Sequence, residues 1–95
     1  MAAYVIADVE VTDPVKYEDY KKLTPGAIAK HGGRFIARGG QTATLEGNWR
    51  PGRVVIIEFP TFEQARNFYT SVEYTAARRA RAGAATMKMI VVDGA

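Results

Sequence analysis

Two glycine pairs bracket a run of five residues, and this stretch divides the chain into two halves of similar build. The pairs are Gly32-Gly33 and Gly39-Gly40, and the run between them reads Arg-Phe-Ile-Ala-Arg. Alternation at period two is typical of a β-strand, and paired glycines are strong turn signals. A strand pattern and a helix pattern precede the stretch, and a strand, a helix and a strand follow it. The sequence therefore predicts the element order βαββαβ in a single domain over residues 1–95.

The predicted first strand, residues 3–11, has one wholly apolar face and one mixed face. The mixed face starts with Tyr4 and Ile6 and ends with two carboxylates. A sheet face that is open to water should be polar throughout, so the apolar part of the mixed face predicts a surface that is partly covered. The same alternation predicts that residues 53–59 and 87–93 form the third and fourth strands.

Capping residues mark where the predicted helices begin. Asp13-Pro14 provides an N-cap and a proline at the first helical position, and a capping box starts the second crossover at Thr61. Thr24-Pro25 is predicted to kink the first crossover helix or to divide it into two, the second piece capped by Thr24 and ending at Lys30, because a residue before proline disfavours the helical conformation. Ser71 is predicted to divide the second crossover in the same way.

The second strand is predicted to begin at Arg34 and to continue to Glu46, with a bulge or sharp bend at Gly39-Gly40. If no bulge falls between them, Arg34 and Arg38 share a face with Ile36. Right-handed crossovers place both helices on one face of a four-stranded antiparallel sheet, which is the ferredoxin-like arrangement of the α+β class. The opposite face is left open. Its apolar part predicts an interface or a ligand cleft.

Composition excludes several classes of protein. There is no cysteine, which removes disulfides and thiolate chemistry. The single histidine offers no metal-ligand spacing, so neither a metal site nor a cofactor is expected. The longest apolar run, Val54–Ile57, is too short to cross a bilayer, and the chain starts without a basic leader. We therefore expect a cytoplasmic protein without a membrane partner.

Seven short segments are arranged in order along nearly the whole chain: Ala3-Tyr4-Val5-Ile6, Val11-Thr12-Asp13-Pro14, His31-Gly32-Gly33-Arg34, Arg38-Gly39-Gly40, Leu45-Glu46-Gly47, Glu58-Phe59-Pro60 and Ser71-Val72-Glu73-Tyr74. Together they resemble the family called domain of unknown function 1330. The resemblance implies a place in the dimeric α/β-barrel superfamily, in which two ferredoxin-like chains pair their open sheet faces as a homodimer. Relatives in that superfamily include small cofactor-free monooxygenases, isomerases and haem-binding branches. This chain departs from the family at Val72, because the family often has proline at that position.

Four charged residues are candidates for a site in the space enclosed by the dimer. Arg34 and Arg38 lie on the second predicted strand, Asp8 lies on the first and Glu58 on the third. In the functional interpretation, arginine binds an anionic group of a substrate while a carboxylate acts as general base. In the structural interpretation, the same residues form a network of ion pairs within the sheet or at the dimer seam. The sequence leaves both open.

The remaining candidates are single residues. His31 is a candidate general base, or an iron ligand by likeness to the haem-binding relatives; the simpler interpretation is that it interacts with the C-terminus of the first helix. Tyr74 and Arg81 are candidates for substrate binding on the last helix, although tyrosines at helical spacing also serve as amphipathic core residues. Trp49 is a candidate lid over the pocket or a contact with the partner chain.

Three functions follow from these candidates. The first is an enzyme or binding protein for a small, anionic organic molecule in a pocket between sheet and helices, monooxygenase- or isomerase-like by superfamily analogy. The second is a non-catalytic structural or regulatory dimer. The third is an RNA-binding module, which shares the βαββαβ order but needs aromatic residues on the third strand. Residues 53–59 carry aliphatic residues and Glu58 there, so nucleic acid is not an expected partner.

Overall fold

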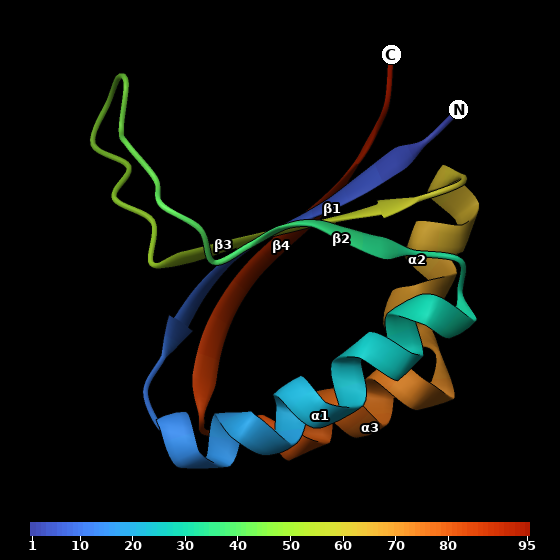
Figure 1. Ribbon diagram of the computed structural model, residues 1–95, viewed down its shortest axis with the longest axis horizontal. Helices are drawn as coiled ribbons and strands as arrows, with labels where there is room; N and C mark the ends of the chain where they lie inside the picture. The colour runs from blue at the N-terminus through green and yellow to red at the C-terminus, as the bar shows by residue number, and fades with distance from the viewer.

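The computed structural model describes residues 1–95, with the elements β1 (Ala3–Val11), α1 (Pro14–Lys30), β2 (Arg34–Arg38), β3 (Arg53–Phe59), α2 (Phe62–Thr70), α3 (Val72–Ala80) and β4 (Ala85–Asp93). The strands form one antiparallel sheet in the order β2-β3-β1-β4, and the helices lie on one side of it (Figure 1). This arrangement confirms the predicted ferredoxin-like fold. No helix is both long and apolar enough to cross a membrane.

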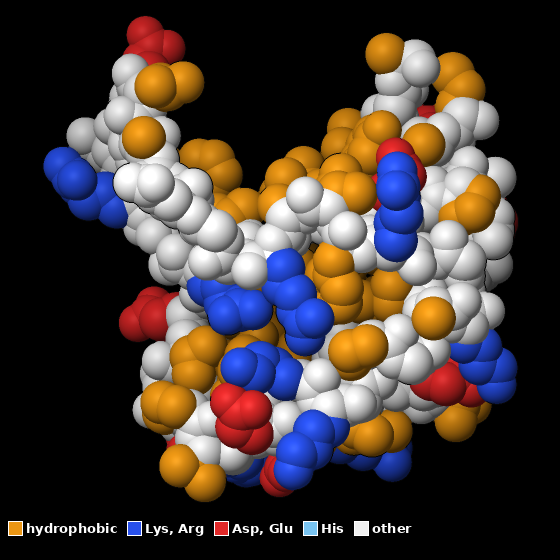
Figure 2. Space-filling view, in the orientation of Figure 1, with side chains coloured by type: hydrophobic (Ala, Val, Ile, Leu, Met, Phe, Trp, Pro, Cys, Tyr) orange, Lys and Arg blue, Asp and Glu red, His pale blue; other side chains and the backbone are white.

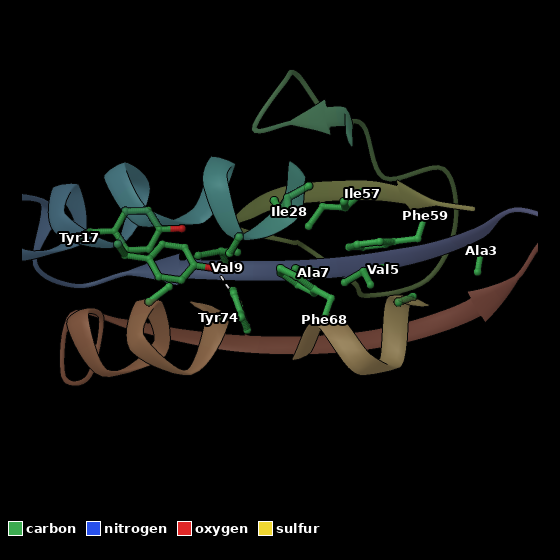
Figure 3. Close-up of a cluster of buried hydrophobic side chains, with 14 of the residues drawn as sticks. Ala3, Val5, Ala7, Val9, Tyr17, Ile28, Ile57, Phe59, Phe68 and Tyr74 are labelled. Carbon is green, nitrogen blue, oxygen red and sulfur yellow. Dashed lines mark hydrogen bonds between the residues drawn. The ribbon is translucent and has the colours of Figure 1, made fainter. Parts of the chain in front are cut away.

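The core lies between the sheet and the helices. The apolar face of β1 supplies Val5 and Val9 to it, as the alternation in the sequence predicts. Aromatic rings continue the core toward the helices: the ring of Phe68 lies 5.1 Å from that of Phe59 and 4.4 Å from that of Tyr74, measured between centroids (Figure 3). These contacts fix α2 and α3 against the sheet.

The opposite face of the sheet carries no helix. Ile6 pairs with Ile56 on β3 and with Ile90 on β4, so the three isoleucines form an apolar row across this open face. Ile90 is exposed, and the other two are half-buried. Figure 2 shows hydrophobic side chains at the base of a hollow above the sheet. The predicted apolar open face is therefore confirmed.

α1 is one continuous helix with Pro25 inside it, so of the two predicted alternatives the two-piece helix is wrong. Thr24 does not cap a new helix, because its hydroxyl donates a hydrogen bond back to the Tyr20 carbonyl at 2.7 Å. Pro25 costs the helix one backbone hydrogen bond. The helix continues across it because Thr24, Ala27 and Ile28 are all buried against the rest of the protein.

The predicted caps other than Thr24 are confirmed. The Asp13 carboxylate accepts a hydrogen bond from the Lys16 N–H at 3.1 Å. Thr61 caps α2, where its hydroxyl accepts from the Gln64 N–H at 3.1 Å. Ser71 ends α2 and caps α3, so the second crossover is in two pieces as expected.

β2 is shorter than predicted. It ends at Arg38, and residues 39–52 leave the sheet as a projecting loop, which we call the arm (Figure 1). Gly39 has a φ of +69°, which favours glycine, and turns the chain there. Pro51, just before β3, has no N–H to donate to a neighbouring strand, which disfavours pairing at that point of the arm.

Candidate ligand site

A β-bulge in β2 decides where its two arginines lie. Arg34 pairs with Glu58 of β3, but the register shifts at Ile36, and Arg38 then pairs with Val55. Glu58 lies on the open face and Val55 on the helix side. The extra residue in the bulged strand reverses the alternation. The condition for a common face of Arg34, Ile36 and Arg38, that no bulge falls between them, is therefore not met, and the bulge is not at the glycines.

Arg34 and Glu58 form an ion pair on the open face. The Arg34 Nε donates to Glu58 Oε1 at 2.8 Å, and the two side chains are 73% and 26% exposed. Arg38 takes no part in this pair. The geometry matches the structural interpretation of these two residues, and it keeps the Glu58 carboxylate away from the helix side of the sheet.

Asp8 anchors the arm to the open face. Its carboxylate accepts hydrogen bonds from Trp49 Nε1 at 2.9 Å and from the Gly52 N–H at 3.0 Å. These two bonds, the first above all, and the nearby charge of Lys88 lower the pKa of Asp8. A carboxylate with both oxygens occupied and a lowered pKa is a poor general base. Trp49 covers Asp8 on the open face, not the space beneath the helices.

His31 lies at the C-terminal end of α1, in contact with α3. Its Nε2 lies 3.0 Å from Glu73 Oε1, and Lys30 Nζ lies 2.9 Å from Glu73 Oε2. The hydrogen bond from Lys30, followed by that from His31, lowers the pKa of Glu73 to about 2. His31 also packs edge-on against Phe68. These contacts join the end of α1 to the start of α3, which is a structural role.

Three tyrosines meet between the helices and the sheet. The rings of Tyr17 and Tyr20 stack at 5.1 Å, and the hydroxyl of Tyr20 lies 2.6 Å from that of Tyr74 (Figure 3). The Tyr74 hydroxyl also contacts the sulfur of Met89 at 3.8 Å. Burial raises the pKa of both Tyr17 and Tyr20. Their hydroxyls are therefore neutral hydrogen-bonding groups at neutral pH.

Three guanidinium groups surround these tyrosines. The charges of Arg53, Arg81 and Arg38 all act on the Tyr17 hydroxyl and oppose the rise in its pKa. The Arg81 guanidinium lies 5.5 Å from the centre of the Tyr20 ring. The Nε atoms of Arg53 and Arg81 are buried without a hydrogen-bond partner. Figure 2 shows basic side chains gathered between α1 and the base of the arm. We call Tyr17, Tyr20, Tyr74, Arg38, Arg53 and Arg81 the Tyr–Arg cluster.

Two spaces adjoin the Tyr–Arg cluster. A cavity of about 30 Å³ is lined by Tyr17, Tyr20, Arg38 and Arg53 among others. A groove of about 480 Å³ runs between α2 and β4 and has Arg81 in its lining. Because the cluster combines donors with an apolar surround, it can bind an organic anion.

The structure divides the residues that the sequence proposed for a site. Arg38, Tyr74 and Arg81 come together in the Tyr–Arg cluster; Arg34, Trp49, Asp8 and Glu58 lie on the open face; His31 lies at the end of α1. Sequence reasoning missed Arg53. The sequence does contain a sign of its role: Arg53 is a charged residue on the same strand face as Val55, Ile57 and Phe59, which all belong to the core.

Solved structures share this fold over nearly the whole chain. A protein of unknown function from Rhodopseudomonas palustris has a TM-score of 0.74 and 18% identity, covering 99% of this chain and 82% of that one. SnoaB, a cofactor-independent oxygenase from Streptomyces nogalater, has a TM-score of 0.62 and 14% identity, covering 99% and 92%. A dimeric protein of unknown function with a ferredoxin-like fold from Bacteroides fragilis has a TM-score of 0.62 and 14% identity, covering 98% and 96%. At these identities the likeness shows the fold alone.

No curated protein matches the chain. The family model of DUF1330, a domain of unknown function, matches residues 2–95. This match spans all seven segments on which the resemblance was based, together with every strand and helix of the structure. The chain therefore belongs to the DUF1330 family.

Proposed function

We propose that this protein binds a small organic anion at the Tyr–Arg cluster and acts as a homodimer. Three arginine Nε donors are buried without an acceptor, on Arg53, Arg78 and Arg81. The observation that carries the proposal is that two of the three, on Arg53 and Arg81, belong to the cluster, where their charges act on the Tyr17 hydroxyl. A buried donor without a partner costs about 1–3 kcal/mol. A carboxylate or another oxyanion would supply the acceptors, and arginine can bind it through two parallel hydrogen bonds.

The reaction type that we propose is monooxygenase- or isomerase-like, and it is supported by likeness to SnoaB, described as a cofactor-independent oxygenase. Oxygenation and isomerisation of this kind can both proceed through an enolate, which forms when a C–H proton of the substrate passes to a water molecule or to a basic group of the substrate itself, and which carries negative charge on an oxygen of the substrate. Molecular oxygen would be the oxidant in the oxygenation. Guanidinium groups and neutral tyrosine hydroxyls would stabilise that charge in a site with little water. Asp8, Glu58 and His31 have no part in this proposal, since their side chains are engaged elsewhere.

Two arginines of one strand provide a matched test of the binding site. We expect calorimetric titration with benzoate to show binding to the wild type, and Arg38→Ala to weaken it at least tenfold, which is about 1.4 kcal/mol. Arg34→Ala removes the same charge from the opposite face and should leave the affinity within twofold. Equal losses of affinity in both variants would mean that anion binding depends only on the net charge of the protein. No loss in either variant would reject the site.

The proposed homodimer forms through the open sheet face. Support comes from the apolar row of Ile6, Ile56 and Ile90, and from the Bacteroides fragilis structure, which is described as dimeric. Ile90→Lys should shift the protein to monomer in sedimentation experiments at micromolar concentration. Val72→Lys, a change at an exposed apolar residue on the helix side, is the control and should leave the dimer intact.

These two experiments separate the candidate functions. A monomeric wild type would reject the paired sheets. A wild-type dimer that binds none of the tested anions would support the alternative of a structural or regulatory dimer.

A further inference from the structure

We infer that the ligand is an elongated amphipathic anion, such as an alkyl or aryl-alkyl carboxylate. Its charged group would enter the cavity at the Tyr–Arg cluster, and its apolar body would lie in the groove between α2 and β4. The inference rests on the proposed function and adds to it the shape and chemical class of the ligand.

The sizes of the two spaces assign one part of the ligand to each. The cavity of about 30 Å³ has room for about two water molecules, which is the size of one carboxylate group. An organic molecule cannot fit there as a whole. The groove of about 480 Å³ falls within the range of about 300–1,000 Å³ that is typical of sites for small organic ligands. The body of the ligand must therefore lie in the groove.

The lining of the groove selects an apolar body. Eight of the eleven residues that line it are hydrophobic, including Phe68, Tyr69 and Val91. Its only charged residues are Arg66 and Arg81. The charged residues that line the cavity are Lys21, Arg38 and Arg53. Every charged residue of the two linings is thus a cation, which favours entry of an anion over that of a neutral or cationic molecule.

Two methionines separate the groove from the cavity. Met87 and Met89 of β4 line both spaces. Methionine is unbranched and flexible, so these side chains can change rotamer without moving the strand. Arg81 lies close to both spaces, because it lines the groove and its guanidinium lies 5.5 Å from the centre of the Tyr20 ring, which lines the cavity. A ligand in the groove can therefore place its charged end against the Tyr–Arg cluster.

A chain-length series tests the inference on the full-length protein. Butanoate, octanoate and uncharged 1-octanol would be titrated by calorimetry, with NMR shift titration for the weakest. Burial of each methylene group contributes about 0.8 kcal/mol, or about fourfold in affinity, so octanoate should bind at least tenfold more tightly than butanoate. Octanol should bind at least tenfold more weakly than octanoate.

A matched pair of tryptophan substitutions locates the apolar body. Thr70 is exposed and lines the groove, so Thr70→Trp should fill the groove and weaken octanoate binding at least tenfold while leaving butanoate binding within twofold. Asn67, also exposed on α2, does not line the groove. Asn67→Trp should therefore change neither affinity. Thermal melting of both variants checks that the fold is retained.

The possible outcomes separate this inference from the proposed function. If butanoate and octanoate bind equally and both depend on Arg38, the inference is overturned and the anion site stands. If octanoate binding is unaffected by Thr70→Trp, the groove is not the place of the apolar body and the inference also fails. If octanoate and octanol bind alike and Arg38→Ala has no effect, the anion site itself is rejected. Failure of every carboxylate to bind overturns both.

Discussion

Arg34 and Arg38 lie four residues apart on one strand, yet they lie on opposite faces of the sheet because β2 bulges at Ile36. With this bulge, the side chain of Arg34 lies on the open face, where it pairs with Glu58. The side chain of Arg38 lies on the helix side, where it lines the cavity and its guanidinium lies 4.2 Å from the centre of the Phe35 ring. One strand thus serves two different surfaces.

The pair formed by Arg34 and Glu58 should contribute little to stability and nothing to ligand binding. Ion pairs with an exposed partner are worth about 0–1 kcal/mol, and Arg34 is mostly exposed. We therefore expect Glu58→Gln to change the free energy of unfolding by less than about 1 kcal/mol in urea titrations at fixed chain concentration. Anion affinity should stay within twofold. A variant that folds but no longer binds anions would restore Glu58 as a candidate catalytic group.

The buried hydrogen bond between Tyr20 and Tyr74 should contribute more to the stability of the fold than the ion pair of Arg34 and Glu58. Tyr74→Phe leaves the Tyr20 hydroxyl without its partner at 2.6 Å, at a cost of about 1–2 kcal/mol. For a domain of this size the melting temperature should fall by about 4–16 °C. Replacing both tyrosines by phenylalanine should lower the free energy of unfolding by less than the sum of the two single changes, since no buried hydroxyl is then left without a partner. Strict additivity in thermal melts would show that the two hydroxyls do not interact.

Gly33 and Gly40 should differ in their tolerance of a methyl group. A Cβ at Gly33 would lie 2.6 Å from Cε1 of Phe59 and 2.9 Å from Cγ2 of Ile28, both in the core. Overpacking of this kind costs about 1–3 kcal/mol, so Gly33→Ala should unfold at lower urea concentration. Gly40 has no atom within 4 Å of the added Cβ, and Gly40→Ala should be neutral to within about 0.5 kcal/mol. Equal destabilisation would contradict the close approach at Gly33.

Acid should release the arm from Asp8. The pKa of Asp8 is lower in the folded protein than its ordinary value of 3.8. The carboxylate therefore stabilises the docked arm above about pH 4, and this contribution is lost as the pH falls through the lowered pKa. Trp49 is the only tryptophan, so its fluorescence reports the arm directly. Acrylamide quenching should rise at low pH in the wild type, and in Asp8→Ala it should be high at every pH.

The elements that local patterns determine could be predicted from the sequence. The alternating apolar face of β1 becomes the core face, and the hydroxyls of Thr61 and Ser71 cap α2 and α3 as their spacing indicates. These features depend on neighbours within a few residues. The fold class then follows from the order of the elements and the handedness of their crossovers.

The predictions that proved wrong concern features that depend on contacts between residues distant in the sequence. Nothing near Ile36 in the sequence marks a bulge, because the bulge depends on how β2 pairs with β3. Trp49 is fixed by Asp8, 41 residues away. Thr24 bonds back to Tyr20 inside a buried helix face, where tertiary packing outweighs the local effect of Pro25. The candidate site was therefore predicted only in part, through Arg38, Tyr74 and Arg81.

The bulge at Ile36 has a consequence for comparing members of the family. Because side chains alternate along a strand, the surface that an arginine of β2 reaches depends on whether the count of residues from Gly33 is odd or even. Loss of a single residue within β2 would transfer a guanidinium between the helix side and the open face of the sheet while leaving every remaining residue type unchanged. Two relatives that differ by one residue within this strand would therefore present this guanidinium on opposite faces of the sheet.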